Sequence, residues 1–321
     1  MGDFPVFDLG RFERSDAAGR AALGRQVDAI CRSTGFLAIA DHGVSRAVID
    51  GVWSAAQSFF DLPAAQKEHV RVAYPGYPYG WLGPGAEALA KSRGEETPPD
   101  LKESFNGGPA APPPGMSDAG ALSFCYAATP FPAEPAGFRA AWNAYYAAME
   151  NLAARIMRVF AAALNLPGDF FAPFIDTPIS ALRALNYPAT DRPPAAGQMR
   201  AGAHTDYGSL TILLPQPGSH GLEILSPEGQ WVEVEPVDNA FVINIGDLMQ
   251  RWTNDRWSST LHRVVADGES ARRQSLAFFH QPNWFAEIAC LEACLAPGET
   301  AKFAPVLSGP YLMGKFRATT V

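Results

Sequence analysis

The tripeptide His204-Thr205-Asp206 places an imidazole and a carboxylate two residues apart. In a β-strand, residues i and i+2 project from the same face, so these two side chains would point in the same direction. In a helix they would diverge by about 200°, so the expected strand context is essential to the argument. One imidazole and one carboxylate occupy two adjacent corners of a metal coordination sphere. A second imidazole from a separate strand would complete one face and leave the opposite positions open.

The second imidazole can be sought by elimination, because the chain has only six histidines. Four of the remaining five lie in less suitable places. His42 precedes a helical region, and His69 lies in a polar stretch. His220 lies in a turn, and His280 ends a strand candidate. His262 lies in a short strand candidate and is the best third ligand. Two histidines and one carboxylate with open positions form the facial triad of non-haem Fe(II) sites. An H-x-D tripeptide is nevertheless common by chance, and a lone strand histidine is usually a core residue.

A second pair of polar residues follows His262 at strand spacing. Arg273 and Ser275 are again i and i+2 and enter an apolar strand candidate, residues 276–279. A planar guanidinium can hold a carboxylate through two hydrogen bonds, and a neighbouring hydroxyl can donate to the same group. The simpler interpretation is a surface salt bridge and a strand-edge hydroxyl. Their position shortly after His262 favours an anion site next to the metal.

These residues need a scaffold, and the apolar pattern changes near residue 180. Helical spacing dominates the first half, with the longest periodic stretch at 136–164. Residues 73–85 are rich in Gly, Pro, Tyr and Trp and are predicted to form no regular element. After residue 180, short apolar runs alternate with turns at 181–187, 209–214, 221–225, 231–234, 240–245, 261–265 and 275–280. This spacing predicts an antiparallel jelly-roll core with flanking helices, a mainly β, α+β fold.

Composition narrows the classes of partner. The 321 residues carry a net charge of -8, which argues against nucleic acid, because phosphate binding needs a basic surface. No apolar run reaches the roughly 20 residues that span a bilayer, and the N-terminus shows no secretory signal. The four cysteines show no C-x-x-C pair and no zinc-finger spacing, and free thiols in a reducing compartment are favoured over disulfides. We expect a cytoplasmic protein that acts on a small molecule and binds no nucleic acid or membrane; the sequence leaves its oligomeric state open.

Short segments along nearly the whole chain resemble the isopenicillin N synthase-like group of 2-oxoglutarate/Fe(II)-dependent dioxygenases. Each segment is weak alone, but their order and spacing together are specific. The resembling segments are 4–9 (FPVFDL), 35–36 (GF), 41–44 (DHGV), 59–63 (FFDLP), 99–103 (PDLKE), 186–188 (NYP), 204–206 (HTD), 245–247 (IGD), 262–264 (HRV) and 273–275 (RQS).

The resemblance implies a double-stranded β-helix (jelly-roll) core with an N-terminal helical region, and Fe(II) at His204, Asp206 and His262. It also implies the carboxylate of 2-oxoglutarate at Arg273 and Ser275. Tyr187 matches a family tyrosine that often adds a hydroxyl to that carboxylate, whereas Asn186 would point away from it on a regular strand. The implied reaction consumes O₂ and 2-oxoglutarate, releases succinate and CO₂, and oxidises a small organic molecule, most commonly by hydroxylation.

The resemblance also suggests a division of the chain. Residues 1–120 would form the N-terminal dioxygenase region, and residues 121–180 the long helix and its connection. Residues 181–285 would form the Fe(II)/2-oxoglutarate core, and residues 286–321 a C-terminal segment that can act as a lid.

Two alternative functions remain open from the sequence. Isopenicillin N synthase itself uses the same triad without 2-oxoglutarate and takes all four electrons from its substrate, and its Arg and Ser hold a substrate carboxylate. A non-catalytic jelly roll that binds a structural Zn²⁺ or a small molecule is the second alternative, although a structural zinc normally has four protein ligands. The identity of the substrate, and the choice between hydroxylation, desaturation and ring closure, are not predicted.

Overall fold

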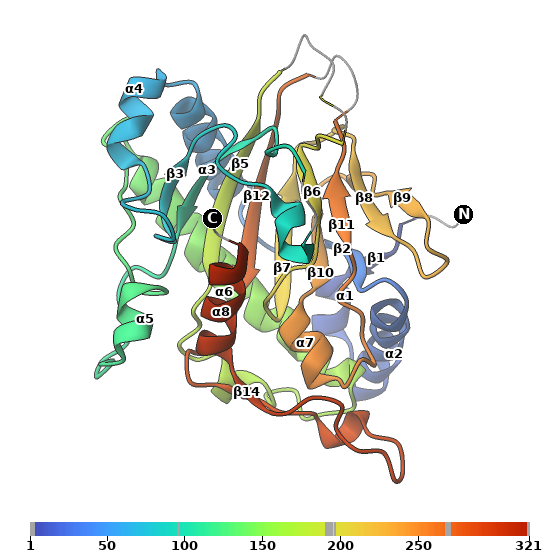
Figure 1. The fold of residues 1–321 in the computed structure, drawn as a ribbon. Coiled ribbons are helices and arrows are strands. Elements are labelled where there is room, and N and C mark those ends of the chain that lie inside the picture. The colour runs from blue at the N-terminus through green and yellow to red at the C-terminus, as the bar shows by residue number, and fades with distance from the viewer. Residues whose placement is uncertain (1–3, 95–96, 190–194, 196, 267–270, 320–321) are drawn as a thin grey trace.

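The computed structural model describes residues 4–94, 97–189, 195, 197–266 and 271–319. Within these residues the larger of two facing sheets has eight strands (Figure 1). All neighbouring strands are antiparallel except β1 and β2, which are parallel. In sheet order the strands are β1 (Val6–Asp8), β2 (Phe36–Ala40), β10 (Phe241–Ile245), β7 (Leu210–Pro215), β12 (Arg273–His280), β5 (Ala181–Tyr187), β4 (Glu103–Gly107) and β3 (Gly80–Leu82).

A smaller sheet covers one face of the larger sheet. Its strands, in order, are β6 (Ala201–His204), β11 (His262–Val264), β8 (Leu222–Leu225) and β9 (Trp231–Glu233). Apolar side chains from both sheets meet in one buried cluster, with Leu185 and Val242 from the larger sheet and Ile224 and Val264 from the smaller one. This arrangement confirms the predicted jelly-roll core. A two-stranded antiparallel sheet of β13 (Glu287–Ile288) and β14 (Val306–Leu307) follows it.

Helices cover the opposite face of the larger sheet, where α2 and α3 both pack against the green helix α6 (Figure 1). The periodic stretch predicted at 136–164 is α6, and its stripe of Tyr145, Met149, Leu152 and Ile156 is fully buried. The helices are α1 (Leu9–Arg14), α2 (Ala17–Ser33), α3 (Arg46–Phe60), α4 (Ala64–Lys67), α5 (Ala119–Ser123), α6 (Phe138–Ala163), α7 (Asp247–Trp252) and α8 (Ser308–Thr319). Four short 3₁₀ turns are η1 (Glu68–Val70), η2 (Leu89–Arg93), η3 (Ala172–Phe174) and η4 (Glu292–Cys294).

One prediction of irregular structure was wrong. The segment 73–85 contains strand β3, which pairs with β4 through Trp81 and Phe105. Trp81 is buried, and its indole N–H donates to Glu103 at 2.8 Å, so tertiary pairing overrides the local abundance of Gly and Pro. The proposed segment boundaries at 120, 180 and 285 stay predictions. Among the described residues, no helix is both long enough and apolar enough to cross a membrane.

Candidate metal and anion site

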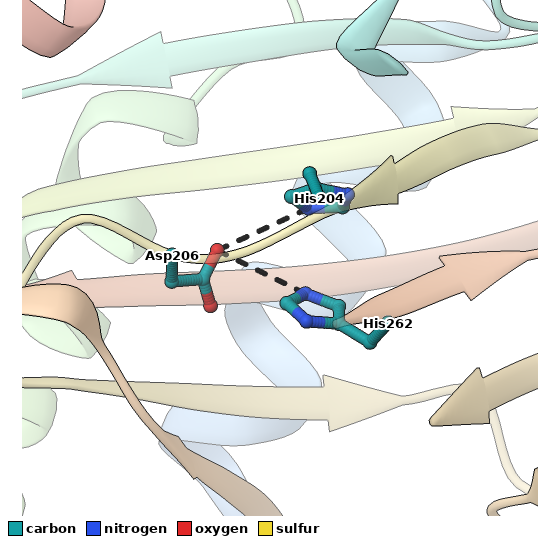
Figure 2. A group of neighbouring side chains, drawn as sticks. All are labelled: His204, Asp206 and His262. Carbon is teal, nitrogen blue, oxygen red and sulfur yellow. Dashed lines mark ion pairs between the residues drawn. The ribbon is translucent and has the colours of Figure 1, made fainter. Parts of the chain in front are cut away.

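The first cluster joins the ends of two adjacent strands of the smaller sheet. His204 ends β6 and His262 begins β11, and the two residues are direct partners across the antiparallel pair. Asp206 follows β6, and Figure 2 shows one of its carboxylate oxygens directed at both imidazoles. Asp206 Oδ1 lies 3.9 Å from the Nε2 atom of each histidine. One candidate ligand atom from each residue lies within 4.8 Å of the others, so the three side chains converge on one point.

Asp206 lies beside His204 in space, but a regular strand does not place it there. Strand β6 stops at His204, so the expected i, i+2 alternation does not place the carboxylate. Its position comes from the next loop, where the Asp206 carbonyl accepts the Asp247 N–H at 2.8 Å. A Cβ atom on Gly246 would lie 2.3 Å from the carbonyl oxygen of Gly208. The loop after β6 therefore packs directly on the backbone that precedes α7.

Backbone carbonyls orient both imidazoles. His204 Nδ1 lies 2.7 Å from the Gly202 carbonyl oxygen, and His262 Nδ1 lies 3.1 Å from that of Thr260. A carbonyl oxygen only accepts, so each Nδ1 carries a proton and each Nε2 is the ring nitrogen left for a metal. Metal-binding histidines are commonly held in this way.

The Asp206 carboxylate is held at its other oxygen. Oδ2 accepts hydrogen bonds from the Thr211 hydroxyl at 2.6 Å and the Asn244 amide at 2.7 Å, which leaves Oδ1 for a metal. Sequence reasoning did not identify these two supporting residues. The available signal was weak: both are polar residues inside otherwise apolar strands, β7 and β10.

The electrostatics of the cluster match metal binding. Burial and the neighbouring His262 lower the pKa of His204 to about 3, so its imidazole is neutral near pH 7. Burial opposes ionisation of Asp206, yet the two histidines and the hydrogen bonds from Thr211 and Asn244 hold its pKa below the usual value. The donor set of two imidazoles and one carboxylate suits a divalent transition metal.

The second cluster begins β12. Arg273 is paired with Tyr187 of β5 across the sheet, and Ser275, two residues on, shares its face. The Arg273 guanidinium lies 5.2 Å from the centre of the Tyr187 ring. Only 4% of Arg273 is exposed, and its Nε and Nη1 atoms have no hydrogen-bond partner among the described residues. A buried cation with unused donors fits an anion, above all a carboxylate, which can accept two parallel hydrogen bonds.

Both clusters lie between the two sheets. Tyr187 belongs to the apolar layer that joins the sheets, together with Ala201 of β6. The ring of His262 packs edge-on against Phe36 of the larger sheet, with 5.4 Å between ring centres. As expected, Asn186 points away from this layer: its amide donates to Glu103, and its oxygen accepts from Arg272.

Comparisons with known proteins agree with these features. Residues 178–282 match the 2OG-Fe(II) oxygenase superfamily, and residues 4–132 match the family described as non-haem dioxygenase in morphine synthesis N-terminal. The chain is 34% identical to validamycin A dioxygenase of Streptomyces hygroscopicus subsp. limoneus over 92% of this chain and 82% of that protein. It is 33% identical to the 2-oxoglutarate-Fe(II) type oxidoreductase hxnY of Emericella nidulans over 98% and 89% of the two chains.

Solved structures give the same result. The fold is similar to that of a full-length Neurospora crassa protein solved in complex with alpha-KG, with a TM-score of 0.85 and 30% sequence identity. The similarity covers 98% of this chain and 96% of that chain. A 2OG-Fe(II) oxygenase family protein of Caulobacter crescentus has a TM-score of 0.84 at 27% identity, over 99% of each chain.

Proposed function

This chain belongs to the 2-oxoglutarate- and Fe(II)-dependent dioxygenase family, and from that premise we propose which of its residues form the active site. His204, Asp206 and His262 hold the iron. Arg273 and Ser275 hold the distal carboxylate of 2-oxoglutarate, and the Tyr187 hydroxyl assists them.

One observation carries the iron assignment. The ligand atoms of the three residues converge within 4.8 Å, while each imidazole Nδ1 and one carboxylate oxygen are already bonded to protein groups. Three protein ligands on one side of a metal leave open positions for co-substrate and O₂. The co-substrate assignment is supported by buried Arg273, whose Nε and Nη1 atoms have no partner among the described residues and so can bind a carboxylate.

The reaction divides between the metal and the protein. Fe(II) supplies the redox chemistry by which O₂ and 2-oxoglutarate are converted to succinate and CO₂ and the substrate is oxidised, most commonly by hydroxylation. The protein's residues would position the reactants: Arg273 would orient the co-substrate from its far end, and His204, Asp206 and His262 would hold the metal. The apolar layer between the sheets keeps water from the reacting groups.

The comparisons favour this function over both alternatives. The Neurospora crassa protein, similar over nearly the whole chain, has been solved with 2-oxoglutarate, so the four-electron oxidase has no specific support. A structural zinc site is also disfavoured, because the described residues contribute three ligands to this group and not four.

The substrate is proposed to be a small organic molecule, as the name of the validamycin A dioxygenase indicates for that relative. A cytoplasmic location is part of the same proposal. Its support is that all four cysteines are free thiols, which is typical of a reducing compartment.

The test is an anaerobic titration of the metal-free protein with Fe(II) and 2-oxoglutarate, followed by the visible charge-transfer absorption of the chelate. We expect the band in the wild type and in His220→Ala, an exposed-histidine control, but not in His204→Ala. Arg273→Met should form the band only at much higher 2-oxoglutarate. If His204→Ala keeps the band, the iron assignment is wrong; if no protein forms it despite bound iron, the assigned co-substrate site is wrong.

A further inference from the structure

The segment 99–103 (PDLKE) is part of the family resemblance but belongs to neither cluster described above. In the structure it runs beside β6, where the Leu101 N–H donates to the Met199 carbonyl at 3.0 Å. The side chains of Asp100 and Lys102 form a buried ion pair, with each residue no more than 3% exposed. Burying two charges is costly before their attraction is counted, so a pair at this location suggests a specific role.

Asp100 is connected to a proposed iron ligand through one residue. Its Oδ1 atom accepts the N–H of Gly202 at 3.1 Å, and the Gly202 carbonyl accepts Nδ1–H of His204 at 2.7 Å. Gly202 is therefore held on both sides, by a carboxylate and by the imidazole. The N–H and the carbonyl of Gly202 belong to different peptide groups, so the connection acts on position more than on polarisation.

The same carboxylate holds the segment that packs against Gly202. Asp100 Oδ2 accepts the N–H of Leu89 at 3.2 Å, and this residue begins η2. A Cβ atom on Gly202 would lie 2.9 Å from the backbone nitrogen of Ala90, so η2 lies directly on β6. Asp100 therefore fixes both the strand that carries His204 and the turn that covers it.

Lys102 neutralises this carboxylate. Its ammonium contacts Asp100 Oδ2 and lies 3.5 Å from Glu87 Oε2. Glu87 in turn accepts two hydrogen bonds from Arg183, at 3.1 and 3.2 Å. The charges of the group balance, with two carboxylates against two cations, so its cost of burial is offset internally and Asp100 can keep both backbone contacts.

We propose that Asp100 is a positioning residue of the iron site: it locks Gly202 so that the Gly202 carbonyl orients the His204 imidazole, and Lys102 supports it. The inference rests on the proposed role of His204 as an iron ligand. Loss of a group that orients a metal ligand typically costs about 10–100-fold in metal affinity. Because Asp100 acts through Gly202, we expect the lower end, about tenfold.

The test compares Asp100→Asn with Glu103→Gln as the matched control. Glu103 also forms a buried ion pair, with Lys67 at 2.8 Å, but its other hydrogen bonds go to Trp81 and Asn186, away from β6. Both variants keep the side-chain volume and weaken a buried lysine–carboxylate pair. The measurement is a Co(II) titration of the metal-free proteins, read by the ligand-field absorption of bound Co(II), together with the thermal midpoint of each metal-free protein.

We expect Asp100→Asn to bind Co(II) about tenfold more weakly with an altered absorption spectrum, and Glu103→Gln to bind as the wild type does. Both should lower the thermal midpoint. An unchanged Co(II) affinity in Asp100→Asn overturns the proposal. Equal weakening in both variants also overturns it, because the effect would then follow from lost stability.

A second variant covers the case in which Asp100→Asn does not fold. Lys102→Met keeps the Asp100 carboxylate and the apolar stem of residue 102, and we expect its Co(II) affinity to fall a few-fold; wild-type affinity there overturns the inference. Failure of the proposed function gives a different result. In that case the wild type and His204→Ala would bind Co(II) equally, whatever Asp100→Asn does.

Discussion

At the scale of single residues, the site is defined by which polar atoms already have partners. Asp206 has one oxygen bonded to Thr211 and Asn244 and one left over. Arg273 is the opposite case, since it is buried and two of its nitrogen atoms have no partner among the described residues. A satisfied group stabilises the fold, whereas an unsatisfied buried cation costs free energy until an anion binds. The two groups should therefore respond to mutation in different ways.

Replacing Arg273 by Met should separate stability from binding. The metal-free, ligand-free variant should be as stable as the wild type or more stable, because an apolar side chain replaces an unpaired buried charge. The same change should weaken 2-oxoglutarate binding about 100-fold, corresponding to the roughly 2–5 kcal/mol typical of truncating one partner of a buried charge pair. Thermal unfolding with and without 2-oxoglutarate measures both effects.

The matched control for this experiment is Arg263→Met. Arg263 also lies over an aromatic ring, that of Trp231, but it is paired with Glu223 at 2.7 Å. It should lose at most about 1 kcal/mol of stability and keep its affinity for 2-oxoglutarate. A marked loss of stability in ligand-free Arg273→Met would show that the guanidinium has a structural partner, contrary to the proposal.

Thr211→Val should weaken metal binding without removing a ligand. The change keeps the shape of the side chain but removes the hydroxyl that donates to Asp206 Oδ2 at 2.6 Å. We expect Fe(II) or Co(II) affinity to fall about tenfold. Thr253→Val is the control, since its buried hydroxyl donates to carbonyls of α7 and accepts from the Trp257 N–H, with no hydrogen bond to the triad. Equal metal affinity in the two variants would contradict the assigned role of Thr211.

At the scale of elements, two constraints bring the triad together. The antiparallel register of β6 and β11 makes His204 and His262 direct partners. The contact between Gly208 and Gly246 then sets the course of the loop that carries Asp206. This contact explains the segment 245–247 (IGD) of the family resemblance: its glycine allows two backbones to meet, and the Asp247 N–H bonds the Asp206 carbonyl.

Gly246→Ala should therefore damage both the fold and the metal site. The added methyl would lie 2.3 Å from a backbone oxygen that no side-chain rotation can move. We expect a loss of about 1–3 kcal/mol in the free energy of unfolding, with weaker Co(II) binding because the Asp206 loop shifts. Denaturant unfolding and metal titration measure the two effects.

Gly51→Ala is the control for the added methyl group. Gly51 lies inside α3, and apart from its chain neighbours and the nearby helix backbone, no atom of the described residues lies within 4 Å of the position that its Cβ would take. Alanine is the better helix former there, so we expect a gain of about 0.5–1 kcal/mol and unchanged metal affinity. If Gly246→Ala and Gly51→Ala change the free energy of unfolding in the same direction, the close backbone contact at Gly246 does not matter for stability.

At the scale of the whole molecule, one large apolar cluster joins the helical half to the β half. Phe59 of α3, Phe105 of β4 and Phe138 of α6 pack against one another with ring centres 5.1–5.4 Å apart. Polar groups inside such a core must be neutral or paired. His280, at the end of β12, is 1% exposed; its Nδ1 is near the Ser180 hydroxyl, and its Nε2 has no partner among the described residues.

Global stability should therefore fall on mild acidification. Burial lowers the pKa of His280 to about 4, whereas an unfolded chain titrates near 6.5. The unfolded state binds the proton first, so this contribution is complete above pH 6.5 and is lost as the pH falls to about 4. His280 by itself contributes a slope of about 1.4 kcal/mol per pH unit within that window.

The measurement is the free energy of unfolding of the metal-free protein at several pH values from about 7 to about 4.5. In His280→Gln the free energy of unfolding should change less steeply with pH than in the wild type, by the equivalent of about one proton. His69→Gln, at an exposed site, should keep the wild-type dependence on pH. Identical slopes in the wild type and His280→Gln would mean that His280 does not stay neutral in the core.

Much of this organisation was predictable from local pattern. Seven apolar runs after residue 180 correspond to strands, and the helical stripe at 136–164 corresponds to α6, because buried faces impose periods of about 2.0 and 3.6 residues on the sequence. The i, i+2 spacing of Arg273 and Ser275 also predicted that their side chains share one face, because both residues lie within the regular strand β12. The order of the short family segments predicted the jelly roll and its cofactors.

The tertiary structure alone decided how each of these side chains is held. Asp206 lies beyond the end of its strand, so its direction depends on a contact with Gly246, which is distant in the chain. Hydrogen bonds from other elements support the triad. Those from Thr211 of β7 and Asn244 of β10 reach Asp206, and Asp100, in the turn before β4, accepts from Gly202 of β6. These bonds form only when the elements meet in the folded protein. Such partners leave no periodic signal in the sequence, because non-local backbone pairing selects them and local propensity does not.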